Sequence, residues 1–87
     1  MQEYSAAVDT CNGIGQRAYV DRCLSEVADS TKNLAACEGI VSDEIRDSCY
    51  MTFAYNKDFS VCPKVTSTYL KNSCYLLSQL AQLPTKP

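Results

Sequence analysis

The stretch from Cys37 to Tyr50 reads CEGIVSDEIRDSCY, and a second stretch from Cys62 to Tyr75 reads CPKVTSTYLKNSCY. Both start at a cysteine, place an aliphatic residue three positions later and end in a second cysteine followed by tyrosine. The stretch from Cys11 to Leu24, CNGIGQRAYVDRCL, has the same layout with a final leucine. Shared residue types at shared offsets indicate an internal repeat.

The cysteine spacing gives the boundaries of this repeat. The six cysteines are separated by 12, 14, 12, 13 and 12 residues, so three C-x11-C units recur every 26 and then 25 residues. We expect one domain over residues 1–87, with repeats at about 4–29, 30–55 and 56–83 and an extended tail over 84–87.

Within each unit the apolar residues follow a helical period. Ile45, Cys49 and Phe53 are spaced by four, which keeps them on one helix face. Four helix starts are indicated by side chains that cap first-turn amides, at Asn33, Ser42-Asp43, Asp58 and Thr66-Ser67. Each repeat then reads as a short helix carrying the first cysteine, a turn, and a longer helix carrying the second. We predict an all-α fold of about six helices, a short α-solenoid of three stacked hairpins.

Disulfides are the expected role of the cysteines. A chain of 87 residues buries too little apolar surface for much stability, and six cysteines can supply cross-links. The favoured pairing is within each hairpin, because pairing neighbouring hairpins strands two cysteines at opposite ends of the stack. Each such loop contributes about 3 kcal/mol in the chain-entropy estimate. The favoured pairs are Cys11 with Cys23, Cys37 with Cys49, and Cys62 with Cys74, while the neighbouring-hairpin pairing stays open.

Metal binding and redox chemistry are the alternatives for the six thiols. Structural zinc sites have a pair of cysteines two to four residues apart, and no two cysteines here are closer than 12. A redox dithiol lacks its C-x-x-C motif. We therefore predict no metal and no cofactor. Structural disulfides indicate an oxidising compartment, outside the cell or at its surface.

The pattern C-x-x-I-x4-I-R-D-S-C-Y at Cys37 to Tyr50, echoed at Cys62 to Tyr75, resembles the cysteine-stapled helical-hairpin repeats of secreted and surface proteins of archaea. Those repeats are similar to shortened tetratricopeptide units. The resemblance covers about Tyr4 to Leu83, and the first unit departs from it in Leu24 and an extra glycine. It implies a fold and a location but no chemistry. A second resemblance is to twin-cysteine hairpins of the mitochondrial intermembrane space, although these carry a C-x9-C or C-x3-C pair on each helix.

Composition excludes several classes of function. Eight Lys and Arg against ten Asp and Glu give a net charge of -2, which offers no basic surface to nucleic acid. No apolar run approaches the roughly 20 residues that span a bilayer. No N-terminal segment reads as a signal peptide, so for a secreted protein we expect the mature form. The chain has no histidine and no constellation for acid-base or nucleophilic catalysis, so we do not expect an enzyme.

The two ends of the predicted stack are the candidate interaction sites. The last helix carries apolar residues around most of its circumference. One set is expected to face the previous repeat: Leu70, Cys74, Leu77 and Ala81. A second set is left facing outward: Tyr69, Leu76, Leu80 and Leu83. The first helix offers its own stripe, Tyr4, Ala7, Val8 and Cys11, from which Tyr4 and Val8 are the predicted contacts. Exposed apolar stripes mark interaction sites.

Three functions from different classes remain. The first is an extracellular structural protein that self-assembles head-to-tail through its ends, as in a cell-surface filament. The second is a secreted monomeric module that binds another surface protein or a glycan on its solenoid face. There, Tyr19, Tyr55 and Tyr69 are the expected solvent-facing aromatic residues. The third is a metallochaperone like those of the intermembrane space, which requires free thiols.

Overall fold

The computed structural model describes residues 2–82, which are all-α and contain no strand. The elements in chain order are α1 (Gln2–Asn12), α2 (Arg17–Thr31), α3 (Ala35–Glu38), α4 (Asp43–Tyr55), the 3₁₀ helix η1 (Phe59–Lys64) and α5 (Thr68–Gln82). The all-α prediction with six helices is confirmed.

Three disulfides close the helix pairs into hairpins. They join Cys11 to Cys23, Cys37 to Cys49 and Cys62 to Cys74, with Cα–Cα distances of 5.5, 5.8 and 5.4 Å. All six cysteines are used, in the pairs that the sequence favoured. The hairpins are therefore α1–α2, α3–α4 and η1–α5.

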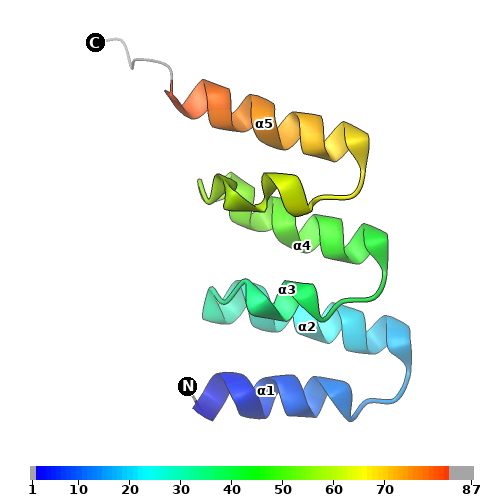
Figure 1. Ribbon diagram of the computed structural model, residues 1–87. Helices are drawn as coiled ribbons and strands as arrows, with labels where there is room; N and C mark the ends of the chain where they lie inside the picture. The colour runs from blue at the N-terminus through cyan, green and yellow to red at the C-terminus, as the bar shows by residue number, and fades with distance from the viewer. Residues whose placement is uncertain (1, 83–87) are drawn as a thin grey trace.

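The hairpins stack in chain order, with α1 at one end and α5 at the other (Figure 1). The long helices of consecutive hairpins contact each other, α2 with α4 and α4 with α5. The long helix of one hairpin also contacts the short helix of the next, α2 with α3 and α4 with η1. The stack is elongated, with principal extents of 49 × 27 × 16 Å.

Three of the four predicted caps form, at Ser42, Asp58 and Ser67, whereas the N-cap residue of α3 is Leu34, which makes no side-chain cap bond, and Asn33 bonds an amide from the position before it. Each side chain accepts a hydrogen bond from a backbone amide in the first turn. The pairs are Asn33 with the Ala35 amide, Ser42 with Ile45, Asp58 with Ser60, and Ser67 with Leu70. Local sequence thus sets where α4, η1 and α5 begin.

The first helices of the three hairpins differ more than the repeat predicts. All were expected to be short, but α1 has 11 residues whereas α3 has 4 and η1 has 6. Lys32 ends α2 in the left-handed conformation, so little chain remains for α3 before Gly39. In η1, Pro63 has no amide to donate, and the segment forms a 3₁₀ helix instead of an α-helix.

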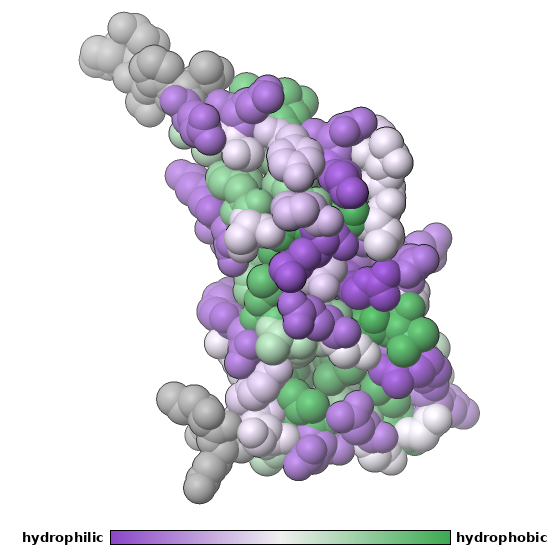
Figure 2. Space-filling model, in the orientation of Figure 1, coloured by the Kyte–Doolittle hydropathy of each residue, from purple (hydrophilic) through white to green (hydrophobic). Residues whose placement is uncertain are grey.

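The core runs along the whole stack as one cluster. Its buried apolar residues come from every helix, and five of the six cysteines are among them. The outer surface is mainly polar on the side shown in Figure 2, where apolar residues gather toward the right-hand edge of the lower half. A thin core of this kind leaves each hairpin dependent on its disulfide and on its neighbours.

Candidate interaction surfaces

We call the contact between consecutive hairpins a junction. The first junction joins α2 to α3 and α4, and the second joins α4 to η1 and α5. At the first junction, Asp21 of α2 is only 1% exposed. Its carboxylate contacts the loop that precedes α4. It accepts hydrogen bonds from the amides of Val41 and Ser42 at 3.0 and 2.9 Å. Arg17, one turn before Asp21, adds an ion pair at 2.8 Å.

The second junction repeats this arrangement 26 residues later. Asp47 is 2% exposed and accepts hydrogen bonds from the amides of Thr66 and Ser67, both at 2.9 Å. The Thr66 hydroxyl donates a further bond at 2.8 Å. Each carboxylate therefore holds the loop that leads into the long helix of the next hairpin. We call this contact the aspartate clamp.

The clamp favours the charged carboxylate. Burial alone raises the pKa of Asp21 and of Asp47, because it removes water from the charged form. The amide hydrogen bonds and the neighbouring Arg17 or Arg46 outweigh burial, so both pKa values lie below the ordinary 3.8. At neutral pH both groups are ionised and fully paired.

Apolar residues fill the rest of each junction. Ile40 and Val65, three residues after the first cysteine of their hairpins, are 2% and 1% exposed. Leu24 of α2 lies so close to Gly39 of α3 that a Cβ on the glycine would meet the leucine Cδ1 at 3.3 Å. In α4, Tyr50 and Met51 take part and are each 4% exposed. Burial, followed by the charge of nearby Glu38, raises the pKa of the Tyr50 phenol.

The N-terminal end of the stack carries the loop half of a junction without its partner. Ile14 stands where Ile40 and Val65 stand, yet it is 45% exposed. Gly15 and Gln16 stand at the clamp positions, and no side chain of the described residues accepts from their amides. Tyr19, which matches the half-buried Ile45 and Leu70, is 59% exposed.

Gly13 directly follows α1, and its amide donates to the carbonyl oxygens of Asp9 and Thr10 at the end of that helix. A Cβ there would meet only carbonyl oxygens of α1 at 3.6 Å, an ordinary contact, and its φ is not positive. It matches Gly39, where a Cβ would come within 3.3 Å of the Leu24 Cδ1 atom of the preceding hairpin, and the exposed Lys64 of the third hairpin. The glycine at 13 keeps a corresponding space open at the end of the stack.

The C-terminal end carries the helix half of a junction. Asn72 stands where Asp21 and Asp47 stand but is exposed. Tyr75 and Leu76 match Tyr50 and Met51, and they are 44% and 55% exposed instead of buried. The last part of α5 is more polar than the last part of α4. Ser78 and Gln79 stand where α4 has Phe53 and Ala54.

The predicted outward stripe of α5 is exposed where the structure describes it. Tyr69, Leu76 and Leu80 are 77%, 55% and 53% exposed, and Leu83 lies outside the described residues. Of these, Leu76 alone has an equivalent in α4 that is buried at a junction, because Leu80 and Tyr69 match Tyr55 and Glu44, which are exposed. Of the residues expected to face the previous repeat, Ala81 is exposed, since α4 ends too early to cover it.

The predicted N-terminal stripe is wrong. Tyr4 and Val8 pack against the core, together with Ala7, and Cys11 is fully buried. These residues lie on the face of α1 that meets α2. The outer face of α1 instead carries exposed small and polar residues, Ser5, Ala6, Asp9 and Thr10.

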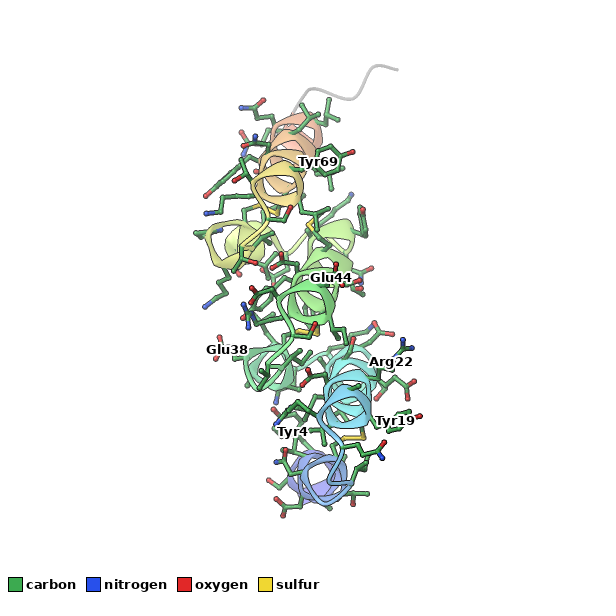
Figure 3. The ribbon with its side chains drawn as sticks, turned by 90° about the vertical axis from the view of Figure 1, so that its right-hand side faces the viewer. Tyr4, Tyr19, Arg22, Glu38, Glu44 and Tyr69 are labelled. Atoms are coloured by element: carbon green, nitrogen blue, oxygen red, sulfur yellow. A yellow bond between two sulfur atoms is a disulfide. The ribbon has the colours of Figure 1, made fainter. Side chains whose placement is uncertain are left out.

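The side of the stack formed by the long helices carries the exposed tyrosines. Tyr19 and Arg22 project from α2 on one side, and Glu38 projects from α3 on the other (Figure 3). A groove of about 620 Å³ lies between α4 and α5, with Tyr55 and Tyr69 in its lining. The exposure expected for Tyr19, Tyr55 and Tyr69 is confirmed, at 59%, 68% and 77%.

The clamp partners were not found by sequence reasoning. Asp21, Asp47 and Asn72 were visible as a shared position, but the amides they meet lie 19 to 21 residues further along the chain. An acidic residue recurring on an otherwise apolar helix face was the available signal. The neighbouring acidic residues Asp43 and Asp47 of α4 have different partners. Asp43 pairs with Arg46, whereas Asp47 serves the clamp.

None of the described helices is long and apolar enough to cross a membrane. Within residues 2–82, no group of three or more Cys, Asp or Glu side chains is placed to hold a metal ion. Comparison of the chain with protein-family models, with curated proteins and with solved structures finds no match.

Proposed function

We propose that this protein is an extracellular structural subunit that associates head-to-tail with further copies of itself into an open filament. One observation carries the proposal. Ile14 at one end and Tyr75 at the other are exposed at positions that are buried in both internal junctions, and Leu76 is exposed where Met51 is buried and Ser25 is half-buried. The ends are thus two halves of a contact that the chain already makes twice.

The two ends differ in composition, which determines the kind of assembly. One offers a loop with Ile14 and two uncapped amides, and the other offers a helix with Asn72, Tyr75 and Leu76. Unlike surfaces on one molecule form a heterologous contact, which extends into rings or filaments rather than closing as a two-fold dimer. Because the internal hairpins stack in an extended line, continuation of that line favours a filament.

Three disulfides support the proposed location. A protein that uses every cysteine in a bridge suits an oxidising compartment. The bridges keep each hairpin intact when the subunit is alone, so that association does not have to fold the chain.

Light scattering of the oxidised protein over a range of concentrations tests this function, together with electron microscopy of the concentrated sample. We expect the mean mass to rise continuously above 9.6 kDa and filaments to appear. Leu76→Glu is expected to lower the association constant at least about tenfold, because burial of a leucine contributes about 1.5–3 kcal/mol.

Leu80→Glu is the matched control, since it places the same charge on the same helix at a position whose equivalents Tyr55 and Asp29 are exposed. It should leave association unchanged. A protein that stays at 9.6 kDa up to about 1 mM overturns the proposal. Equal loss with both variants contradicts the head-to-tail arrangement and points to pairing of two α5 stripes.

A monomeric binding module is the second candidate, favoured by the groove between α4 and α5. The exposed Tyr55 and Tyr69 line this groove together with the buried Met51 and the half-buried Leu70. Tyrosine suits contacts with proteins and glycans. A strictly monomeric protein in the light-scattering experiment leaves this candidate standing.

A further inference from the structure

The internal junctions also predict how two copies would be aligned, and this inference rests on the proposed function. We propose that copies join in the register of the internal junctions. Tyr75 of one copy then packs on Gly13 of the next, and Asn72 reaches the amides of Gly15 and Gln16.

The contact of Tyr75 with Gly13 follows from the first junction. Leu24 lies one residue after the second cysteine of its hairpin and approaches Gly39, two residues after the first cysteine of the next hairpin. Tyr75 and Gly13 stand at the same two positions. The tyrosine is 44% exposed, and a Cβ on the glycine would meet only carbonyl oxygens of its own helix at 3.6 Å, so both are free to meet a second copy. A side chain at position 13 would fit within its own hairpin, so the effect of adding one reports on the contact with a second copy.

The contact of Asn72 follows from the aspartate clamp. Asp21 and Asp47 each bind two successive loop amides of the next hairpin. Gly15 and Gln16 are the matching amides of the first hairpin. Their loop differs in one respect, since Gly15 has a φ of 95° whereas Val41 and Thr66 have negative φ. Glycine adopts either conformation readily, so the loop can take the internal geometry when a copy docks.

Asparagine makes this contact weaker than the internal ones. A carboxylate offers two acceptor oxygens, one for each amide, whereas asparagine offers one oxygen and a donor group that an amide repels. The hydrogen bonds to a charged acceptor are also stronger. The contact between copies is therefore weaker than the equivalent contact within the chain, which suits reversible assembly.

Association constants of four variants, measured by sedimentation equilibrium, test this register. Gly13→Leu is expected to weaken association at least about tenfold by filling the space for Tyr75, while thermal unfolding of the dilute protein stays unchanged. Asn12→Leu adds the same side chain one residue earlier, where the equivalent Glu38 is exposed, and should leave association unchanged.

Asn72→Asp is expected to tighten association about fivefold to tenfold by restoring the clamp. Its control, Ser73→Asp, adds the same charge where the equivalents Ser48 and Arg22 are exposed, and should not tighten it. In the wild-type protein, the amide NMR signals of Gly15 and Gln16 should shift as concentration rises.

The outcomes separate this inference from the function on which it rests. A wild-type protein that does not associate overturns both. A wild-type protein that associates, but whose association Gly13→Leu leaves intact, overturns the register and leaves the function. If Asn72→Asp fails to tighten association and the two amide signals stay fixed, the clamp between copies is wrong.

Discussion

The two internal junctions and the two ends of the stack use the same positions with different residues. Inside the chain a buried aspartate, Asp21 or Asp47, binds two amides of the next hairpin. At the C-terminal end the same position is an exposed asparagine, Asn72. A fully paired carboxylate suits a permanent contact, because it is costly to bury without partners. An asparagine tolerates both water and a partner.

The apolar residues show the same gradation. Near the end of α4, Phe53 and Ala54 are 8% and 1% exposed. In α5 these positions are Ser78 and Gln79, while Tyr75 stays aromatic. The end of the stack is thus neither a fully polar cap nor a full junction. It keeps an aromatic residue at Tyr75 but has polar residues at positions 78 and 79, as expected for weak self-association.

Removal of a clamp carboxylate should have the largest effect on stability. Asp47→Ala leaves the part-buried amides of Thr66 and Ser67 without their acceptor, so we expect a loss of about 3 kcal/mol in the free energy of unfolding. Asn72→Ala, at the matching exposed position, should change it by less than about 0.5 kcal/mol. Urea unfolding of the oxidised proteins measures both. Similar losses of unfolding free energy in the two variants would contradict the claim that this position contributes to stability at a junction but not at the end.

The disulfides allow a second comparison, between the centre and the end of the stack. All three bridges join cysteines 12 residues apart, so the chain-entropy estimate gives each about 3 kcal/mol. The pair Cys37→Ala and Cys49→Ala should cost more than the pair Cys11→Ala and Cys23→Ala, because Cys23 alone is partly exposed. Thermal unfolding ranks the two variants, and the reverse order would contradict the burial argument.

The two glycines at matching positions should respond differently to the same substitution. Gly39→Leu forces a side chain against Leu24 and should cost about 1–3 kcal/mol. Gly13→Leu makes only ordinary contacts, at 3.6 Å with carbonyl oxygens of α1, and should cost less than about 0.5 kcal/mol in dilute solution. Chemical denaturation decides this, and an equal cost would mean that Gly13 is needed by its own hairpin.

The smallest of the expected effects is that of acid, which should lower the stability of the junctions more than that of the ends. The folded-state pKa values of Asp21 and Asp47 are lowered, so their stabilisation is fully present above the ordinary 3.8 and is lost as the pH falls through the folded-state values. Thermal unfolding between pH 6 and pH 2 should show the loss, and the Asp21→Asn, Asp47→Asn double variant should show a flatter profile. An unchanged slope in that variant would assign the acid sensitivity to other carboxyl groups.

Local features of the fold were predictable from the sequence, and contacts between hairpins were not. The cysteine period determined the hairpins, and the caps at Ser42, Asp58 and Ser67 were readable because a cap bonds within its own first turn. The orientation of α1 was missed. Periodicity shows that Tyr4 and Val8 share a face but not which side of the helix the core occupies.

The junction contacts were beyond sequence reasoning for a related reason. The amides bound by Asp21 and Asp47 are distant in the chain and belong to the backbone, so no residue type marks them. Gly13 illustrates the same limit, because its role becomes visible only beside the close contact of Leu24 with Gly39. The sequence places Leu76 and Leu80 on one apolar stripe of α5. The equivalent residues of α4 differ, since Met51 is buried and Tyr55 is exposed.

Mixing two end variants tests the head-to-tail claim most directly. Ile14→Glu blocks one end and Leu76→Glu blocks the other, so each variant alone should be monomeric at 9.6 kDa in light scattering. An equimolar mixture should form dimers and nothing longer, because one intact end of each variant can still meet. A mixture that stays monomeric while the wild-type protein assembles, or a single variant that still forms filaments, would contradict the account.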